Sequence, residues 1–150
     1  MTRSAAREIA VHLIYAMQCT GEDPEGVLEE RFQESYYELL SEENEVYAEK
    51  PDKKQLAYIR SVVEGVSARR EELEGYLTRY SIGWNVNRIS RLARAAMELA
   101  MYEALYVEDV PMNEAIHEAV RLAQTYEEPE TVAFVNGVLG SFSRDREPTK

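Results

Sequence analysis

Three residues near the N-terminus, Arg7, Val11 and Tyr15, have types and a spacing that could contact a nucleic acid. They are spaced by four, so on an α-helix they lie above one another on a single ridge. An arginine can hold a phosphate group, and a tyrosine can stack on an unpaired base. The same ridge also suits a helix that covers a neighbouring helix, because aromatic side chains usually bury apolar area. The ridge alone leaves both interpretations open, and packing is the more common of the two.

Residues that could catalyse a reaction are sparse. His12 and His117 lie on different expected helices, and with the single cysteine, Cys19, they do not form a metal-ligand motif. The seven glycines are scattered and form no phosphate-binding loop. Neighbouring acids such as Glu71 and Glu72 belong to a charged helical face, where solvation explains them. We therefore expect no enzymatic activity, no metal and no cofactor.

The net charge of −11 is distributed unevenly along the chain. Residues 21–50 hold 11 acidic side chains against Arg31 and Lys50, a net charge of −9. Residues 108–130 hold 7 acidic side chains against Arg121, a net charge of −6. The remaining segments are close to neutral or slightly positive, so an acidic total is compatible with a local basic face, which a phosphate senses over a Debye length of about 8 Å. The acidic segments themselves are best explained as solvated faces.

The composition indicates a soluble protein of the cytoplasm. Apolar residues make up 45% of the chain and charged residues 30%, which is enough for one folded domain. There is no run of about 18 apolar residues and no secretory signal pattern. One cysteine cannot form an internal disulfide. We therefore expect a cytoplasmic location.

The elements that position these residues are predicted to be helices throughout. The longest, Trp84 to Tyr106, has no Gly or Pro and is apolar on nearly every side, which is typical of a buried helix. The other periodic segments, with capping residues at Ser4, Asp52, Asn113 and Thr131, are 4–19, 25–40, 53–67, 69–79, 113–125 and 131–142. The polar segment 41–52 is interpreted as a mobile loop. The fold class is therefore all-α, with about seven helices in two packed lobes, about 1–50 and 53–143, and a polar tail at 144–150.

Several motifs in order resemble the bacterial NusB family. They are RSAAREIAVHLIYA in the first helix, LAYIRSVVEGV in the third, WNVNRISRLARAAMELAMYEAL in the central helix, then VPMNEAIHEAVRLAQTY and FVNGVLG. Each motif alone is weak, but the ordered set over about residues 3–142 is specific. The resemblance implies an all-helical fold of two lobes and a protein that is not an enzyme.

The resemblance also implies a function in transcription antitermination. Members of this family bind the single-stranded boxA element of nascent RNA, especially ribosomal RNA leaders, as a heterodimer with the small-subunit ribosomal protein NusE. That complex joins NusA and NusG on RNA polymerase. Some members form homodimers that cover the RNA face, and the sequence leaves this state open.

Two alternatives remain at this stage. The first is a NusB-like helical adaptor that binds protein partners without specific RNA recognition, which the acidic net charge favours. The second is the NusB-like accessory domain of RNA methyltransferases, in which a catalytic domain follows.

The resemblance assigns candidate residues position by position. In the arginine-rich first turn, Arg3 and Arg7 match the family, but Ser4 and Ala5 replace residues that are commonly basic, which predicts a weaker grip on RNA. The other RNA candidates are Tyr15, Glu130, which could accept hydrogen bonds from base amino groups, and Phe134, which could stack on a base or simply pack.

The candidates for contact with the basic ribosomal partner are Tyr15, Glu71 and Arg88, where complementary charge would orient docking. Ala93 and Glu98 depart from the family's charge pattern in the central helix, which changes detailed packing and not the fold.

Overall fold

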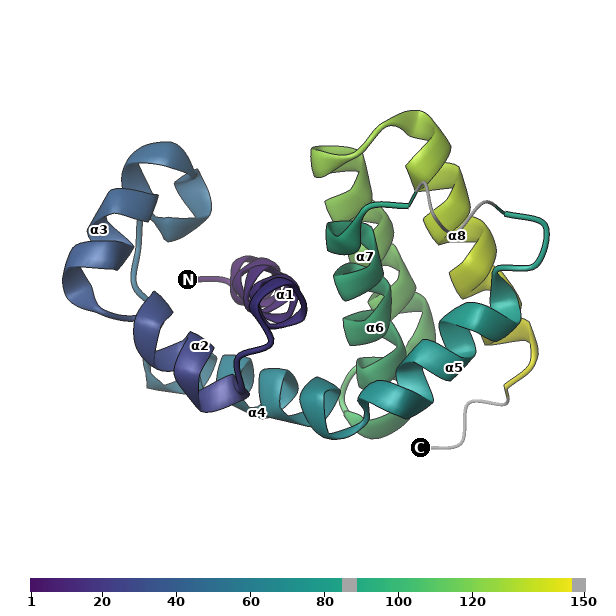
Figure 1. Cartoon of the computed structure of the whole chain (residues 1–150), viewed down its shortest axis with the longest axis horizontal. Helices are drawn as coiled ribbons and strands as arrows, with labels where there is room; N and C mark the ends of the chain where they lie inside the picture. The colour runs from purple at the N-terminus through teal and green to yellow at the C-terminus, as the bar shows by residue number, and fades with distance from the viewer. Residues whose placement is uncertain (85–88, 147–150) are drawn as a thin grey trace. The chain divides into compact units, whose positions relative to one another are not determined.

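The computed structural model describes residues 1–84 and 89–146, and these residues form helices and no strand. This confirms the all-α prediction. The elements are α1 (Arg3–Thr20), α2 (Pro24–Arg31), α3 (Glu34–Glu43), the 3₁₀ helix η1 (Glu45–Tyr47), α4 (Lys53–Ala68), α5 (Arg70–Tyr80), α6 (Arg91–Tyr106), α7 (Met112–Tyr126) and α8 (Pro129–Arg144) (Figure 1). No described helix is long and apolar enough to span a lipid bilayer.

The chain divides into two compact units, Met1–Ala68 and Arg69–Lys150. This boundary differs from the lobe boundary expected near residues 50–53. The difference arises because α4 packs closely against α1 and also contacts α2. Its apolar stripe, which includes Ile59 and Val63, is buried in the first unit.

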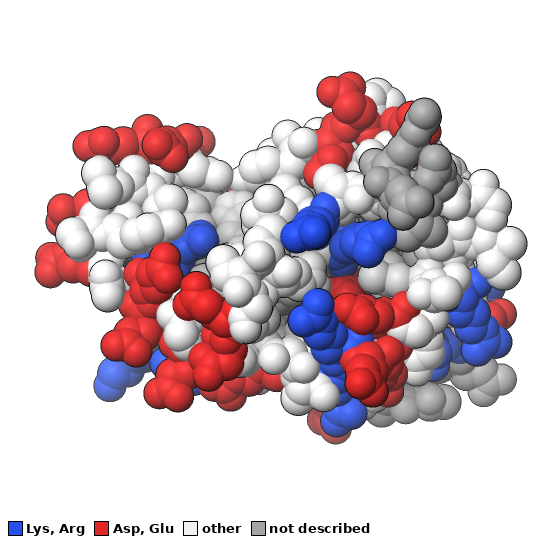
Figure 2. All heavy atoms as spheres, in the orientation of Figure 1, with Lys and Arg blue, Asp and Glu red and all other residues white. Residues whose placement is uncertain are grey.

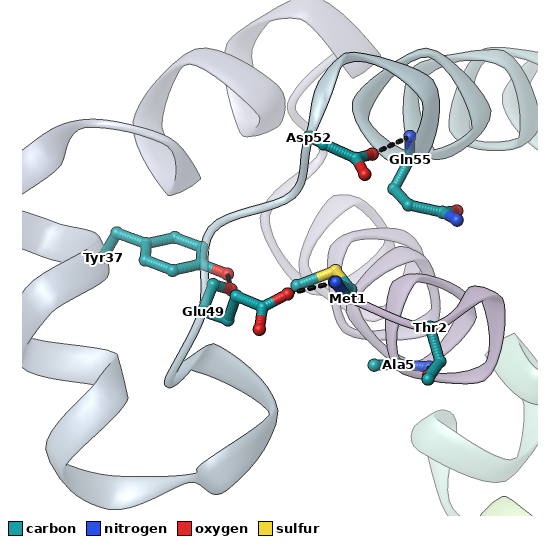
Figure 3. A network of polar contacts seen from close by, with 7 residues as sticks. All are labelled: Met1, Thr2, Ala5, Tyr37, Glu49, Asp52 and Gln55. Carbon is teal, nitrogen blue, oxygen red and sulfur yellow. Dashed lines mark hydrogen bonds and ion pairs between the residues drawn. The ribbon is translucent and has the colours of Figure 1, made fainter.

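Helix α1 is the central helix of the first unit. Its apolar stripe, with Ile9, Leu13 and Ile14 fully buried, faces the other helices of that unit. Thr2, and not the expected Ser4, caps the helix: its Oγ1 accepts a hydrogen bond from the Ala5 N–H at 3.0 Å (Figure 3). The predicted cap of α4 is confirmed, since Asp52 Oδ1 accepts a hydrogen bond from the Gln55 N–H at 2.9 Å (Figure 3).

The predicted helix 25–40 is two helices, α2 and α3, separated at Phe32 and Gln33. The break lets three rings pack together. Phe32 stacks on Tyr37 with centroids 5.8 Å apart, and Tyr37 meets the edge of Tyr47 at 5.3 Å. Tyr47 belongs to η1, within the segment expected to be a mobile loop, yet it is only 3% exposed. The segment is therefore held by aromatic packing.

A polar network joins this aromatic cluster to α1. The Tyr47 hydroxyl contacts His12 Nδ1 at 2.7 Å and accepts a hydrogen bond from Arg31. Burial, and then the nearby Arg31 charge, lower the pKa of His12 to about 4, so the ring is neutral at pH 7. The Tyr37 hydroxyl donates to the Glu49 carbonyl oxygen at 2.8 Å, and the Glu49 carboxylate contacts the Met1 ammonium group (Figure 3).

Helix α6 is the buried centre of the second unit, as predicted. Ala95, Met97 and Met101 have no exposed surface, and even Glu98 is only 2% exposed. The helix begins later than expected, because the Ser90 hydroxyl caps it by accepting a hydrogen bond from the Ala93 N–H at 3.0 Å. Trp84 lies outside the helix.

Helices α7 and α8 pack on α6 and on each other (Figure 1). They begin at Met112 and Pro129, earlier than the expected starts at Asn113 and Thr131. In both cases a proline is the cause: Pro111 precedes α7 directly, and Pro129 occupies the first position of α8, where its missing N–H costs nothing.

Candidate nucleic-acid interface

Arg3 is held in place by two residues of α4. Its Nε donates a hydrogen bond to Gln55 Oε1 at 2.9 Å, and its guanidinium carbon lies 4.1 Å from the centroid of the Tyr58 ring. The two terminal nitrogens of Arg3 make no hydrogen bond with any described residue. A guanidinium group stacked on one face and free along one edge is suited to binding a phosphate.

Arg7 and Val11 are buried, with 3% and 2% of their surfaces exposed. The Arg7 guanidinium lies 5.8 Å from the Tyr58 centroid. The ridge formed by Arg7, Val11 and Tyr15 therefore packs along most of its length, as the alternative interpretation had it. Only Tyr15, with 40% of its surface exposed, presents a large contact area to a ligand.

Two further candidates lie on α8 in the second unit. Glu130 is exposed in its first turn. Phe134 is only 2% exposed and meets the Trp84 ring edge-to-face, with centroids 5.2 Å apart and planes at 82°. A buried ring with an aromatic partner cannot stack on a base without leaving the core. The structure therefore favours the packing interpretation of Phe134.

The connection before α8 is tied to the start of α6. The Ser90 hydroxyl, which caps α6, also donates a hydrogen bond to Glu127 Oε1. On the neighbouring helix, Gly137 faces Trp84, because a Cβ at this position would lie 3.3 Å from the indole atom Cζ2. Glu130 therefore lies in the first turn of α8, between a connection bonded to Ser90 and a middle turn packed against Trp84.

Of the two remaining candidates for partner contact, the structure describes only Glu71. Glu71 is exposed in the first turn of α5. Its sequence neighbours, and not Glu71 itself, contact the Tyr106 ring, which is 39% exposed: the Tyr106 hydroxyl donates to both oxygens of Glu72 at 2.6 and 2.8 Å, and the Arg69 guanidinium lies 3.8 Å from the ring centroid. Arg88 lies outside the described residues.

Negative charge in the first unit gathers on one group of elements. All 11 acidic side chains between residues 21 and 50 are exposed. On the face drawn in Figure 2, acidic side chains gather over this part of the unit. The N-terminal end of α4 differs, because its first turn holds the exposed Lys53 and Lys54 and no acid. The charge asymmetry expected from the sequence is therefore present on the surface of this unit.

Sequence analysis missed the α4 side of the Arg3 site. Gln55 occupies the N-terminal end of the stripe that continues through Ile59, Val62 and Val66, and a polar residue at a buried position of such a stripe is a signal of a buried hydrogen bond. Tyr58 follows three residues later on the same side of the helix. Both could have been identified from the periodicity of α4, but their contact with Arg3 requires the packing of two helices.

The matches with known proteins agree with this architecture. The NusB family model matches residues 4–144. The chain belongs to the NusB family. A curated relative, the transcription antitermination protein NusB of Acetivibrio thermocellus, is 36% identical over 140 residues, covering 93% of this chain and 87% of the relative.

Solved NusB structures share the fold. T. maritima NusB superimposes with a TM-score of 0.77 at 26% identity, covering 97% of this chain and 93% of that one. A second structure, of the antitermination factors NusB and NusE in complex with dsRNA, gives a TM-score of 0.73 at 21% identity, covering 96% and 97%. The relatives of this NusB-family chain are antitermination proteins and not enzymes, in agreement with the sequence prediction.

Proposed function

We propose that the chain is a transcription antitermination factor that binds the boxA element of nascent ribosomal RNA together with the ribosomal protein NusE. The family match over residues 4–144 carries the antitermination role. In this role the complex of chain, RNA and NusE joins NusA and NusG on RNA polymerase in the cytoplasm and makes the polymerase resist termination.

The RNA-binding part of the proposal is supported by Arg3. Its guanidinium is fixed by Tyr58 and Gln55 and keeps its terminal nitrogens available. Tyr15, exposed at the far end of α1, offers a ring for stacking. Glu130, exposed at the start of α8, could accept hydrogen bonds from base amino groups. Arg7 acts differently from Arg3. Because Arg7 is buried, it supports the Tyr58 ring from below the surface and adds positive potential to the site.

The partner part of the proposal rests on charge and exposed aromatic area. NusE is a basic protein, so exposed acids would speed and orient its docking. Glu71 directly precedes Glu72, whose carboxylate accepts the hydrogen bond of the exposed Tyr106 side chain, and tyrosine is enriched among the residues that contribute most to interface energy. We assign this part of α5 and α6, with Tyr15 of α1, to contact with NusE.

One observation favours a second candidate function. Arg7 is buried and residues 4 and 5 carry no charge, so the first turn of α1 offers only Arg3 as an accessible arginine. A NusB-like adaptor that binds NusE but does not recognise RNA specifically would fit such a thinned basic site.

A titration separates the two functions. A labelled boxA-like single-stranded RNA and a scrambled strand of equal length are titrated with the chain, alone and with NusE. The proposal predicts that the boxA strand binds more tightly than the scrambled strand and that NusE increases this difference. Equal binding of both strands in the presence of NusE would support the adaptor instead.

A further inference from the structure

The first turn of α4 carries positive charge and no acid, as do the first turns of α1, which begins with Arg3, and α6, which begins with Arg91. The first turns of α2, α3, α5, α7 and α8 each contain at least one acid, which the positive end of a helix favours. Helix α4 instead begins with Lys53 and Lys54, both exposed. Positive charge is unfavourable at this end of a helix.

Helical geometry distinguishes the two lysines. Successive residues of an α-helix are rotated by about 100°. Gln55 and Tyr58, which both contact Arg3, are about 60° apart around α4, so Arg3 lies between these two directions. Lys54 is one turn before Tyr58 and lies about 70° from the Arg3 direction. Lys53 lies about 170° away, on the opposite side of the helix.

The acids nearest this position are already engaged. The Asp52 carboxylate accepts the hydrogen bond that caps α4, and the Glu49 carboxylate contacts the Met1 ammonium group (Figure 3). Each therefore has a positive or hydrogen-bond-donating neighbour that offsets part of its charge. Both acids therefore have a partner of their own, and Lys54 remains exposed in the first turn of α4.

We propose that Lys54 binds an RNA phosphate beside the one held by Arg3, and that Tyr58 and Gln55 are positioning residues for this pair of cations. Lys54 thereby replaces part of the positive charge that Ser4 and Ala5 do not supply. The two cations, Arg3 on α1 and Lys54 on α4, then bind neighbouring phosphates of one RNA strand. The inference rests on the proposed RNA-binding function and adds α4 to its binding surface.

The test compares two matched variants, Lys54→Gln and Lys53→Gln, in RNA binding over a range of salt concentrations. Each variant removes one exposed charge from the same helical turn, and the loss of an unfavourable charge leaves stability equal or slightly higher. For single-stranded RNA, one phosphate contact contributes about 0.7 to the slope of log K against log salt. Lys54→Gln is therefore expected to lower the slope by about 0.7 and the affinity at 0.1 M salt about fivefold.

Lys53→Gln is expected to leave both values close to those of the wild type, and Lys54→Arg to retain them. Equal slopes for the two glutamine variants would overturn the role of Lys54 while leaving the proposed function intact. If the wild-type chain with NusE does not bind RNA, the proposed function fails, and the inference fails with it. The two failures are thus distinguishable in one experiment.

Discussion

Replacing Phe134 by alanine tests whether this ring packs or binds RNA. The ring is 2% exposed and meets Trp84 edge-to-face at 5.2 Å, so the substitution leaves a cavity beside the indole. Phe→Ala substitutions in cores cost about 3–5 kcal/mol of the free energy of unfolding. With about 2–4 °C per kcal/mol for a chain of this size, the melting temperature is expected to fall by about 6–20 °C.

The assay is urea and thermal unfolding of both proteins, followed by circular dichroism and by the fluorescence of Trp84, the single tryptophan. RNA affinity is then measured well below the transition of the variant, where it is expected to stay near the wild-type value. Phe134→Leu, which refills most of the cavity, is expected to lose much less stability. An unchanged melting temperature together with lost RNA affinity would refute the packing argument.

Three further predictions follow from burial and capping. His12 has a pKa of about 4 in the folded chain against about 6.5 in the unfolded chain, so the unfolded chain binds the proton first as the pH falls. The free energy of unfolding is therefore expected to fall by up to about 3 kcal/mol between pH 6.5 and pH 4. His12→Asn should flatten this part of a plot of the free energy of unfolding against pH, whereas the same substitution at the exposed His117 should not. Ser90→Ala removes the cap of α6 and should lower the free energy of unfolding in urea by about 1 kcal/mol, a change that Ser67→Ala at the end of α4 should not produce. Arg7→Glu puts a carboxylate at a buried position beside Tyr58, so calorimetry should show a loss of about 3–5 kcal/mol, and a variant as stable as the wild type would contradict the burial of Arg7.

Periodicity predicted most helices because their apolar stripes are local features of the sequence. The stripe of α1 and the nearly all-round apolar character of α6 were sufficient to predict their burial, which is confirmed. The break between α2 and α3 has no glycine or proline to signal it. It exists because Phe32, Tyr37 and Tyr47 pack together, a non-local contact that periodicity cannot reveal.

Helix starts were less predictable because several residues compete for each cap. Thr2 and Ser4 are both good N-caps, and the structure uses Thr2. At α8, a proline at the first helical position starts the helix two residues before the threonine expected to cap it. Single-residue signals of similar strength are decided by the geometry of the preceding turn.

The candidate site shows the same limit. Resemblance indicated Arg3 and Arg7 as a pair, but only packing shows that Arg7 is buried while Arg3 keeps free nitrogens. Phe134 was left open between stacking and packing, and its contact with Trp84, 50 positions away in the chain, favours packing. Residues that depend on a partner from another helix could not be assigned from the sequence alone.

The most direct test of the antitermination role is read-through in a purified transcription reaction. A template with a boxA element upstream of a terminator is transcribed by RNA polymerase with NusA, NusG and NusE, with and without the chain. The account predicts that the chain increases the fraction of transcripts that pass the terminator, and that a scrambled boxA abolishes the increase. Read-through that is unchanged by the chain, or that is raised equally on the scrambled template, would contradict it.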